Sequence, residues 1–109
     1  MDVKIVSQNE VGKTFEIKSE VSGDITMFVN KAFDEDSDAH FLVVAIRELP
    51  LLNVANIQYP IKFDNEEVRN YAFDNEVTES WVKGFLPQIE ESIINGKKSD
   101  TNNSDVNNN

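Results

Sequence analysis

The sequence contains no cysteine and a single histidine, His40. Without cysteine the chain cannot form disulfides, Cys-based zinc sites or thiol nucleophiles. Its four glycines stand far apart, so it has no glycine-rich loop of the kind that holds phosphate groups. No apolar run approaches the roughly 20 residues that span a bilayer. We therefore expect no cofactor and no contact with a membrane.

The residues that could carry catalysis or bind a metal ion occur in unsuitable patterns. His40 opens an apolar run, away from any nucleophile motif, and a catalytic base needs a positioned partner. Aspartates alternate from Asp34 to Asp38 as in a calcium loop. However, Ala39 occupies the place of the required glycine, and Ala45 that of the bidentate glutamate. The sequence predicts no catalytic residues, no metal ligands and no enzymatic activity.

The net charge of −10 arises from ten basic and twenty acidic residues. Residues 64–91 contain eight acidic and two basic side chains, whereas residues 97–109 contain equal numbers of each sign. An acidic surface repels phosphate backbones, so we expect no direct binding of nucleic acid. The same surface would attract a basic protein. The alternative is that the charge only keeps the protein soluble.

Strand patterns occupy the first part of the chain. Residues 3–6 are predicted to form a short strand, and residues 14–21 alternate between apolar and polar as in a half-buried antiparallel strand. Residues 40–46 are continuously apolar apart from the opening histidine, which is typical of a strand covered on both faces or nearly so. Residues 54–63 alternate again. Pro60 predicts that this last strand lies at an edge or contains a bulge.

Residues 25–33 fit two structures. Every second residue from Ile25 to Val29 is apolar, as in a strand, but the apolar residues also fit a helix capped by Asp24. We favour a strand because most of these residue types prefer one and because the turn at Gly23 suits a hairpin.

The residues after 63 predict helices. Asp64 and Glu67 are spaced as a capping box, with Asp64 as the N-cap. A second segment carries apolar residues four apart, which predicts a stripe that packs on a sheet: Val77, Trp81, Phe85, Ile89 and Ile93. Pro87 predicts either a kink or a helix start nearby. Gly96, followed by lysines, predicts the end of this helix.

The predicted fold is one α+β domain over residues 1–96, with a twisted antiparallel sheet of about four strands packed by the C-terminal helix or helices. Residues 97–109 contain one apolar residue and many asparagines, and we expect them to be disordered. The chain opens directly into a strand pattern without the basic and apolar regions of a secretory signal. We therefore expect a cytoplasmic location.

The segment at residues 85–93, with the sequence FLPQIEESI, resembles the helix-entry motif of the SecB-like export-chaperone superfamily. In that motif a hydrophobic pair and a proline precede a helix that carries an Arg-Glu pair and a further apolar residue. Glu91 and Ile93 match this pattern, whereas Glu90 stands where arginine is expected. The order of strands followed by a helix is also similar. The resemblance implies a strongly twisted sheet through which copies assemble, and apolar grooves that hold unfolded chains.

Two functions follow as hypotheses. The first is a non-enzymatic, chaperone-like protein-binding module that presents apolar surface within an acidic domain, binds a basic or partly unfolded protein and forms an oligomer through its sheet. The alternative is a small acidic inhibitor, of the kind encoded by phages, that imitates nucleic-acid charge in the basic groove of its partner. The candidate partner-binding residues are apolar for the first function and acidic for the second: Leu49, Leu51, Leu52, Trp81 and Phe85, and Glu66, Glu67, Glu76 and Glu79.

Overall fold

A computed structural model describes the backbone of residues 1–107 and the side chains of residues 1–97. The fold is α+β, as predicted, but its sheet has five strands rather than about four. The strands are β1 (Asp2–Gln8), β2 (Gly12–Ser19), β3 (Gly23–Asp34), β4 (Ala39–Leu49) and β5 (Val54–Phe63). A short 3-10 helix, η1 (Pro50–Leu52), joins the last two strands, and the helices α1 (Glu66–Asn75) and α2 (Glu79–Asn107) follow.

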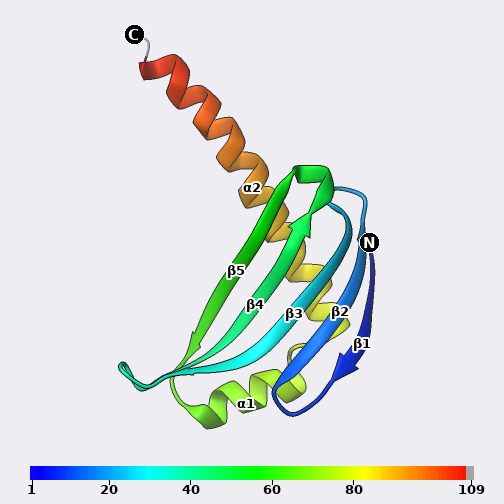
Figure 1. Cartoon of the computed structure of the whole chain (residues 1–109), viewed down its shortest axis with the longest axis vertical. Coiled ribbons are helices and arrows are strands. Elements are labelled where there is room, and N and C mark those ends of the chain that lie inside the picture. Colours follow the sequence, from blue (N-terminus) through cyan, green and yellow to red (C-terminus); the bar gives the residue numbers. More distant parts are fainter. Residues whose placement is uncertain (108–109) are drawn as a thin grey trace.

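The five strands form one antiparallel sheet in which they lie in chain order (Figure 1). Tight turns make this meander: the side chain of Asn9 accepts hydrogen bonds from the amides of Val11 and Gly12 between β1 and β2. Gly23 opens β3 with φ at 91°, a conformation that glycine adopts without strain. Residues 25–33 therefore form a strand, as favoured. The edge position of β5, predicted from Pro60, is also confirmed.

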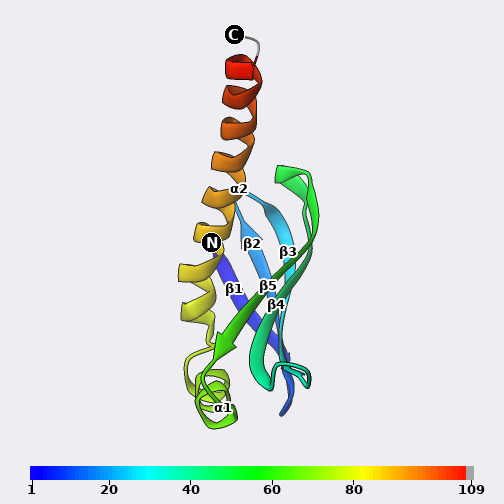
Figure 2. The ribbon, with the colours of Figure 1, turned by 90° about the vertical axis from the view of Figure 1, so that its left-hand side faces the viewer.

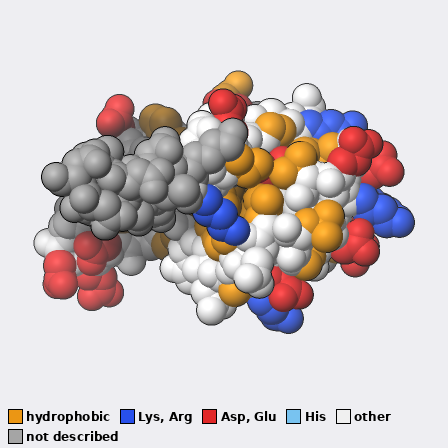
Figure 3. All heavy atoms as spheres, turned by 90° about the horizontal axis from the view of Figure 1, so that it is seen from above, with side chains coloured by type: hydrophobic (Ala, Val, Ile, Leu, Met, Phe, Trp, Pro, Cys, Tyr) orange, Lys and Arg blue, Asp and Glu red, His pale blue; other side chains and the backbone are white. Residues whose placement is uncertain are grey.

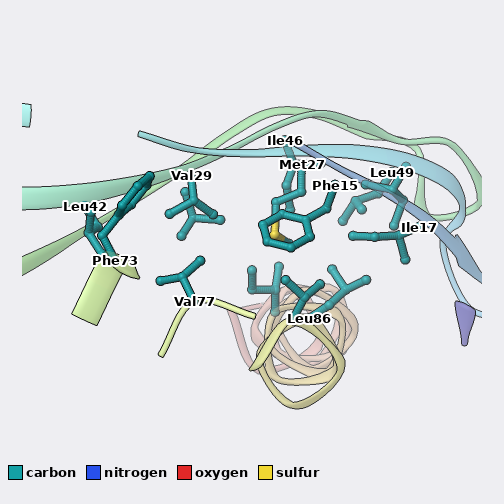
Figure 4. Close-up of a cluster of buried hydrophobic side chains, with 14 of the residues drawn as sticks. Phe15, Ile17, Met27, Val29, Leu42, Ile46, Leu49, Phe73, Val77 and Leu86 are labelled. Atoms are coloured by element: carbon teal, nitrogen blue, oxygen red, sulfur yellow. The ribbon is translucent and has the colours of Figure 1, made fainter. Parts of the chain in front are cut away.

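Both helices lie on the same side of the sheet (Figure 2). The strand residues that point toward them alternate with outward ones, so β2 and β3 supply Phe15, Ile17, Met27 and Val29 to one buried cluster. Figure 4 shows this cluster filling the space between the sheet and the helices, with Leu86 entering from α2. The apolar stripe of α2 thus packs on the sheet as its four-residue spacing predicts.

The helix boundaries correct two details of the sequence prediction and exclude one of its two alternatives at Pro87. Asn65, rather than Asp64, is the N-cap of α1: its backbone is extended and its side chain accepts a hydrogen bond of 2.9 Å from the amide of Val68. The helix α2 begins at Glu79 and passes through Pro87. It also continues beyond Gly96, where the sequence predicts its end.

The continuity of α2 through its proline has a physical reason. An interior proline destabilises a helix by about 3 kcal/mol. Pro87 lies on the exposed side of α2, and the stripe packs on the sheet both before it, at Val82, and after it, at Ile89. Packing on both sides of the proline therefore holds one continuous helix. The predicted disorder of residues 97–109 stays a prediction, because the side chains of residues 98–109 lie outside the described residues.

Candidate functional site

The side of the sheet that faces away from the helices is here called the open face. No element of the described chain covers it (Figure 2). The pairing register places outward side chains of neighbouring strands beside one another: Phe28 beside Ala45, and Val43 beside Pro60. The apolar side chains of the open face are contiguous and form a patch, here called the apolar strip: Phe28, Ala32, Phe41, Val43, Ala45 and Pro60.

The apolar strip does not belong to the core. None of its members is in the buried cluster or packs against it, although five of the six are half-buried by their neighbours on the sheet. Strand β4 is the clearest case. Its inward residues Leu42, Val44 and Ile46 are buried, while its outward residues Phe41 and Val43 have no covering layer. The continuous run at residues 40–46 predicts cover on both faces or nearly so, whereas helices cover only the inward face of β4 in the described chain.

Three hollows lie side by side on the open face and form a trough across the sheet. The largest has a volume of about 440 Å³ and crosses β1, β2 and β3, between Lys4 and Asp24. Asp24 lines both the largest hollow and the second one. Phe28 and Arg47 line both the second hollow and the third. Phe28 therefore stands between two depressions near the centre of the sheet. Charged side chains line the largest hollow, and the Phe28 ring lies at the other two.

The charges of the open face nearly cancel. Its side chains include four basic and five acidic residues, a net charge of −1, so the rest of the chain carries −9. The basic residues are Lys4, Lys18, Arg47 and Lys62, and the acidic ones are Asp2, Glu16, Asp24, Asp34 and Glu48. The helical segment at residues 64–91 alone carries −6. The two sides of the protein thus differ strongly in electrostatic character.

Both edges of the sheet carry features that oppose pairing with another strand. The carboxylate of Glu79, at the start of α2, accepts a hydrogen bond of 2.8 Å from the amide of Ile5 in the edge strand β1. At the other edge, Pro60 has no amide proton, and Asn56 adopts a left-handed backbone conformation with φ at 56°. Blocked donors, prolines and irregular backbone are the usual means by which a sheet avoids edge-to-edge association.

The predicted apolar contact residues lie away from the open face. Leu49 is fully buried in the core, so it is not available to a partner, and Leu52 packs partly against the core. Leu51 is 66% exposed at the η1 end of the molecule, where Figure 3 shows apolar side chains among charged ones. Trp81 and Phe85 are stacked with their ring centroids 4.6 Å apart, and both pack against the core. The structure therefore does not bring these residues together into one surface.

The predicted acidic contact residues have different surroundings. Glu66 and Glu67 are exposed in the first turn of α1, where negative charge is favourable beside the helix N-terminus. Glu76 is exposed just after the same helix. Glu79 accepts the hydrogen bond from the Ile5 amide at the edge of β1. The other three carboxylates make no such contact with the sheet among the described residues. Glu66 forms an ion pair of 4.0 Å with Arg69 of its own helix.

Glu90 is buried on the covered side of the sheet, with 4% of its surface exposed. Its carboxylate accepts hydrogen bonds from the hydroxyl groups of Ser19, at 2.6 Å, and Ser22, at 2.5 Å. The turn between β2 and β3 is thereby attached to the middle of α2. An arginine in this position would bury a guanidinium group against two hydroxyls without a carboxylate partner.

Lys13 makes a further polar contact between sheet and helix. Its ammonium group donates to the carbonyl oxygens of Phe73, at 2.5 Å, and Val77, at 2.9 Å, at the C-terminal end of α1. It also lies 4.7 Å from the centroid of the Phe73 ring. Burial lowers the pKa of Lys13 below its ordinary value of 10.5; the carboxylate of Asp74 opposes this shift and the ammonium of Lys31 adds to it.

His40 lies at the start of β4 and faces the helix side of the sheet. The centroids of its ring and the Phe33 ring are 4.6 Å apart. Within the described residues, its Nδ1 atom forms no hydrogen bond. Within residues 1–97, no three side chains of His, Asp or Glu are grouped so that they could hold a metal ion.

Comparisons of the chain with models of protein families, with curated proteins and with solved structures found no match. The resemblance of residues 85–93 to the SecB-like superfamily therefore stays a prediction. Neither described helix combines the length and the apolar character that crossing a bilayer requires.

The apolar strip was missed in the sequence because its members are spread over three strands. The one available signal was the apolar run of β4, which is longer and more continuous than the covering of one face requires.

Proposed function

We propose that the chain is a non-enzymatic protein-binding module that contacts its partner through the open face of the sheet. One observation carries this proposal: six apolar side chains form a contiguous strip on a sheet face that no described element covers. Protein interfaces typically combine an apolar centre with a polar rim. The apolar strip, bordered by Asp24 and Arg47, has this arrangement.

The proposal keeps the predicted class of function and changes its location. The surface predicted from Leu49 to Leu52 is partly buried, whereas Val43 and Phe28 lie at the centre of the open face. A chaperone-like mode, in which the same face holds a partly unfolded chain, is one form of this function. The apolar strip supports either form because it supplies contact area without specific chemistry.

Capture experiments with matched variants test the proposal. Val43→Glu places a charge in the centre of the apolar strip, and Leu51→Glu makes the same kind of change at the exposed η1 end. We expect the wild type and Leu51→Glu to retain the same protein from lysate and Val43→Glu to lose it. Retention should survive high salt, because apolar contacts are not screened as surface charges are. Equal retention by all three proteins would contradict the proposal.

A second function, charge mimicry toward a basic partner, is favoured by the exposed carboxylates on and beside α1. Glu66, Glu67 and Glu76 are exposed there, within a segment of net charge −6. Charge reversal in the double variant Glu66→Lys/Glu67→Lys tests this function. Capture that is lost in this variant and in high salt, but retained in Val43→Glu, would favour mimicry over apolar contact.

A further inference from the structure

Strand β4 indicates that the open face is covered in the functional protein. Antiparallel strands with one face in water alternate between apolar and polar residues, whereas strands covered on both sides are continuously apolar. From Phe41 to Ile46 every residue of β4 is apolar, and Phe41, Val43 and Ala45 all point outward. The covering layer must therefore come from outside the described part of this chain.

The charge distribution distinguishes between the candidate partners. A basic protein would be drawn to residues 64–91, which carry −6, rather than to the open face, which carries −1. A second copy of the chain would instead be favoured at the open face. Two molecules that each carry −10 repel one another over most of their surfaces, and the repulsion is smallest where the open faces meet.

Because both edges of the sheet oppose pairing, self-association would use the open face. The Glu79 carboxylate accepts the hydrogen bond of an edge amide in β1, and Pro60 and Asn56 interrupt the regular edge of β5. Joining two sheets edge to edge would require removal of these features. Packing one sheet face on another leaves all of them in place.

The area is sufficient for a weak dimer. Five strands about 4.8 Å apart, each contributing about eight residues with a rise of about 3.3 Å, give a face of about 600 Å². Two such faces bury about 1,200 Å², the lower limit for specific interfaces. Association through this surface should therefore depend on protein concentration.

We propose that the open face is covered by the open face of a second copy, in a two-fold symmetric dimer. This inference rests on the proposed function and names its partner. A two-fold interface brings the same surface of both copies together, so it requires a surface that is complementary to itself. The open face meets this requirement because its centre is apolar, its rim carries both signs of charge, and Phe28 stands beside hollows that the Phe28 of the other copy can enter.

Sedimentation equilibrium of the purified full chain over a wide concentration range tests the proposal. We expect the wild type to shift from monomer to dimer, and Leu51→Glu to behave like it. Val43→Glu should weaken the dimer by about tenfold or more, since the symmetric interface would bury two unpaired charges. A wild type that stays monomeric at every concentration overturns the inference. So does a dimer that Val43→Glu leaves unchanged.

A second measurement avoids dependence on the folding of Val43→Glu. Because the chain has no cysteine, one introduced cysteine carries one spin label. Thr26→Cys places the label on the open face, and Glu67→Cys places it on α1, behind the sheet. Stacked sheets lie about 10 Å apart. Dipolar coupling between copies should therefore be strong for Thr26→Cys and weak for Glu67→Cys, and the reverse order overturns the proposal.

Failure of this inference is distinguishable from failure of the proposed function. If the wild type is monomeric but Val43→Glu loses a protein that Leu51→Glu retains, the open face binds a different protein, and only the dimer is wrong. If the wild type is monomeric and all variants capture alike, both proposals are wrong. If the wild type forms the face-to-face dimer, the second copy is the protein that the open face contacts, and both stand even when no other protein is captured.

Discussion

The two faces of the sheet show how similar residues acquire different roles from their surroundings. Phe15 on the covered face and Phe28 on the open face lie in neighbouring strands, and both are aromatic residues within alternating patterns. Phe15 is fully buried among the residues of the core, whereas Phe28 is half-buried beside two hollows. Burial against helices stabilises the fold. Apolar surface without such a cover is available for association.

The largest effect expected from this comparison concerns truncation of the two phenylalanines. Phe15→Ala should lower the free energy of unfolding by about 3–5 kcal/mol, because it removes a ring from a closely packed core. Phe28→Ala should lower it by less than about 2 kcal/mol in dilute solution, because its ring borders open hollows. Urea unfolding at low protein concentration measures both. Equal losses would contradict the difference between the faces.

The next prediction concerns the buried carboxylate on the covered side. Glu90→Ala should lower the free energy of unfolding by about 3 kcal/mol, because it leaves the hydroxyl groups of Ser19 and Ser22 buried without an acceptor. Glu91→Ala removes an exposed carboxylate from the same turn of α2 and should change stability by less than about 0.5 kcal/mol. Thermal unfolding of the two variants provides the comparison. Similar losses in both would show that the serine contacts contribute little.

A smaller effect is expected at the edge of β1. Glu79→Ala removes the acceptor of the Ile5 amide and should lower stability by about 1 kcal/mol. Hydrogen exchange of the Ile5 amide should become faster in this variant. Glu76→Ala, a nearby exposed carboxylate, is the control and should leave this exchange rate unchanged. Protection of Ile5 that persists in Glu79→Ala would mean that the edge is held by other contacts.

The smallest expected effect is a pH dependence at Lys13. Because burial lowers the pKa of Lys13 in the folded protein, the unfolded chain binds more protons between that pKa and 10.5. The stability of the wild type should therefore rise with pH in this window relative to Lys13→Met, which has no titrating group there. Urea unfolding of both proteins at neutral and alkaline pH measures the difference. A difference that falls with pH would contradict the burial of the ammonium group.

Local patterns in the sequence predicted most of the covered side of the fold. The alternation around Phe15 and Ile17 and the stripe that contains Leu86 each follow from the period of one element. Pro60 predicted an edge strand or a bulge, and the structure places β5 at the edge. Helix ends were less accurate: Asn65 and Asp64 are both good N-caps, and only the position of α1 against the sheet selects between them.

The candidate site could not be predicted in the same way. The apolar strip joins Phe28, Val43 and Pro60 from three strands, and their proximity depends on a pairing register that no single strand specifies. The helix residues Trp81 and Phe85 looked suitable for a partner because of their size. In the structure they pack against the core, so their apolar surface is largely used in folding.

By itself, the sequence determined the class of the fold, the acidic character of residues 64–91 and the unusual apolar excess of β4, because each depends on residues that are close in the chain. Only the tertiary structure decided that both helices lie on one side of the sheet. That arrangement buries Phe15 and leaves Val43 uncovered, although both belong to strands with apolar faces. The physical reason is that burial depends on contacts between distant segments, whereas propensity and periodicity depend on neighbouring residues.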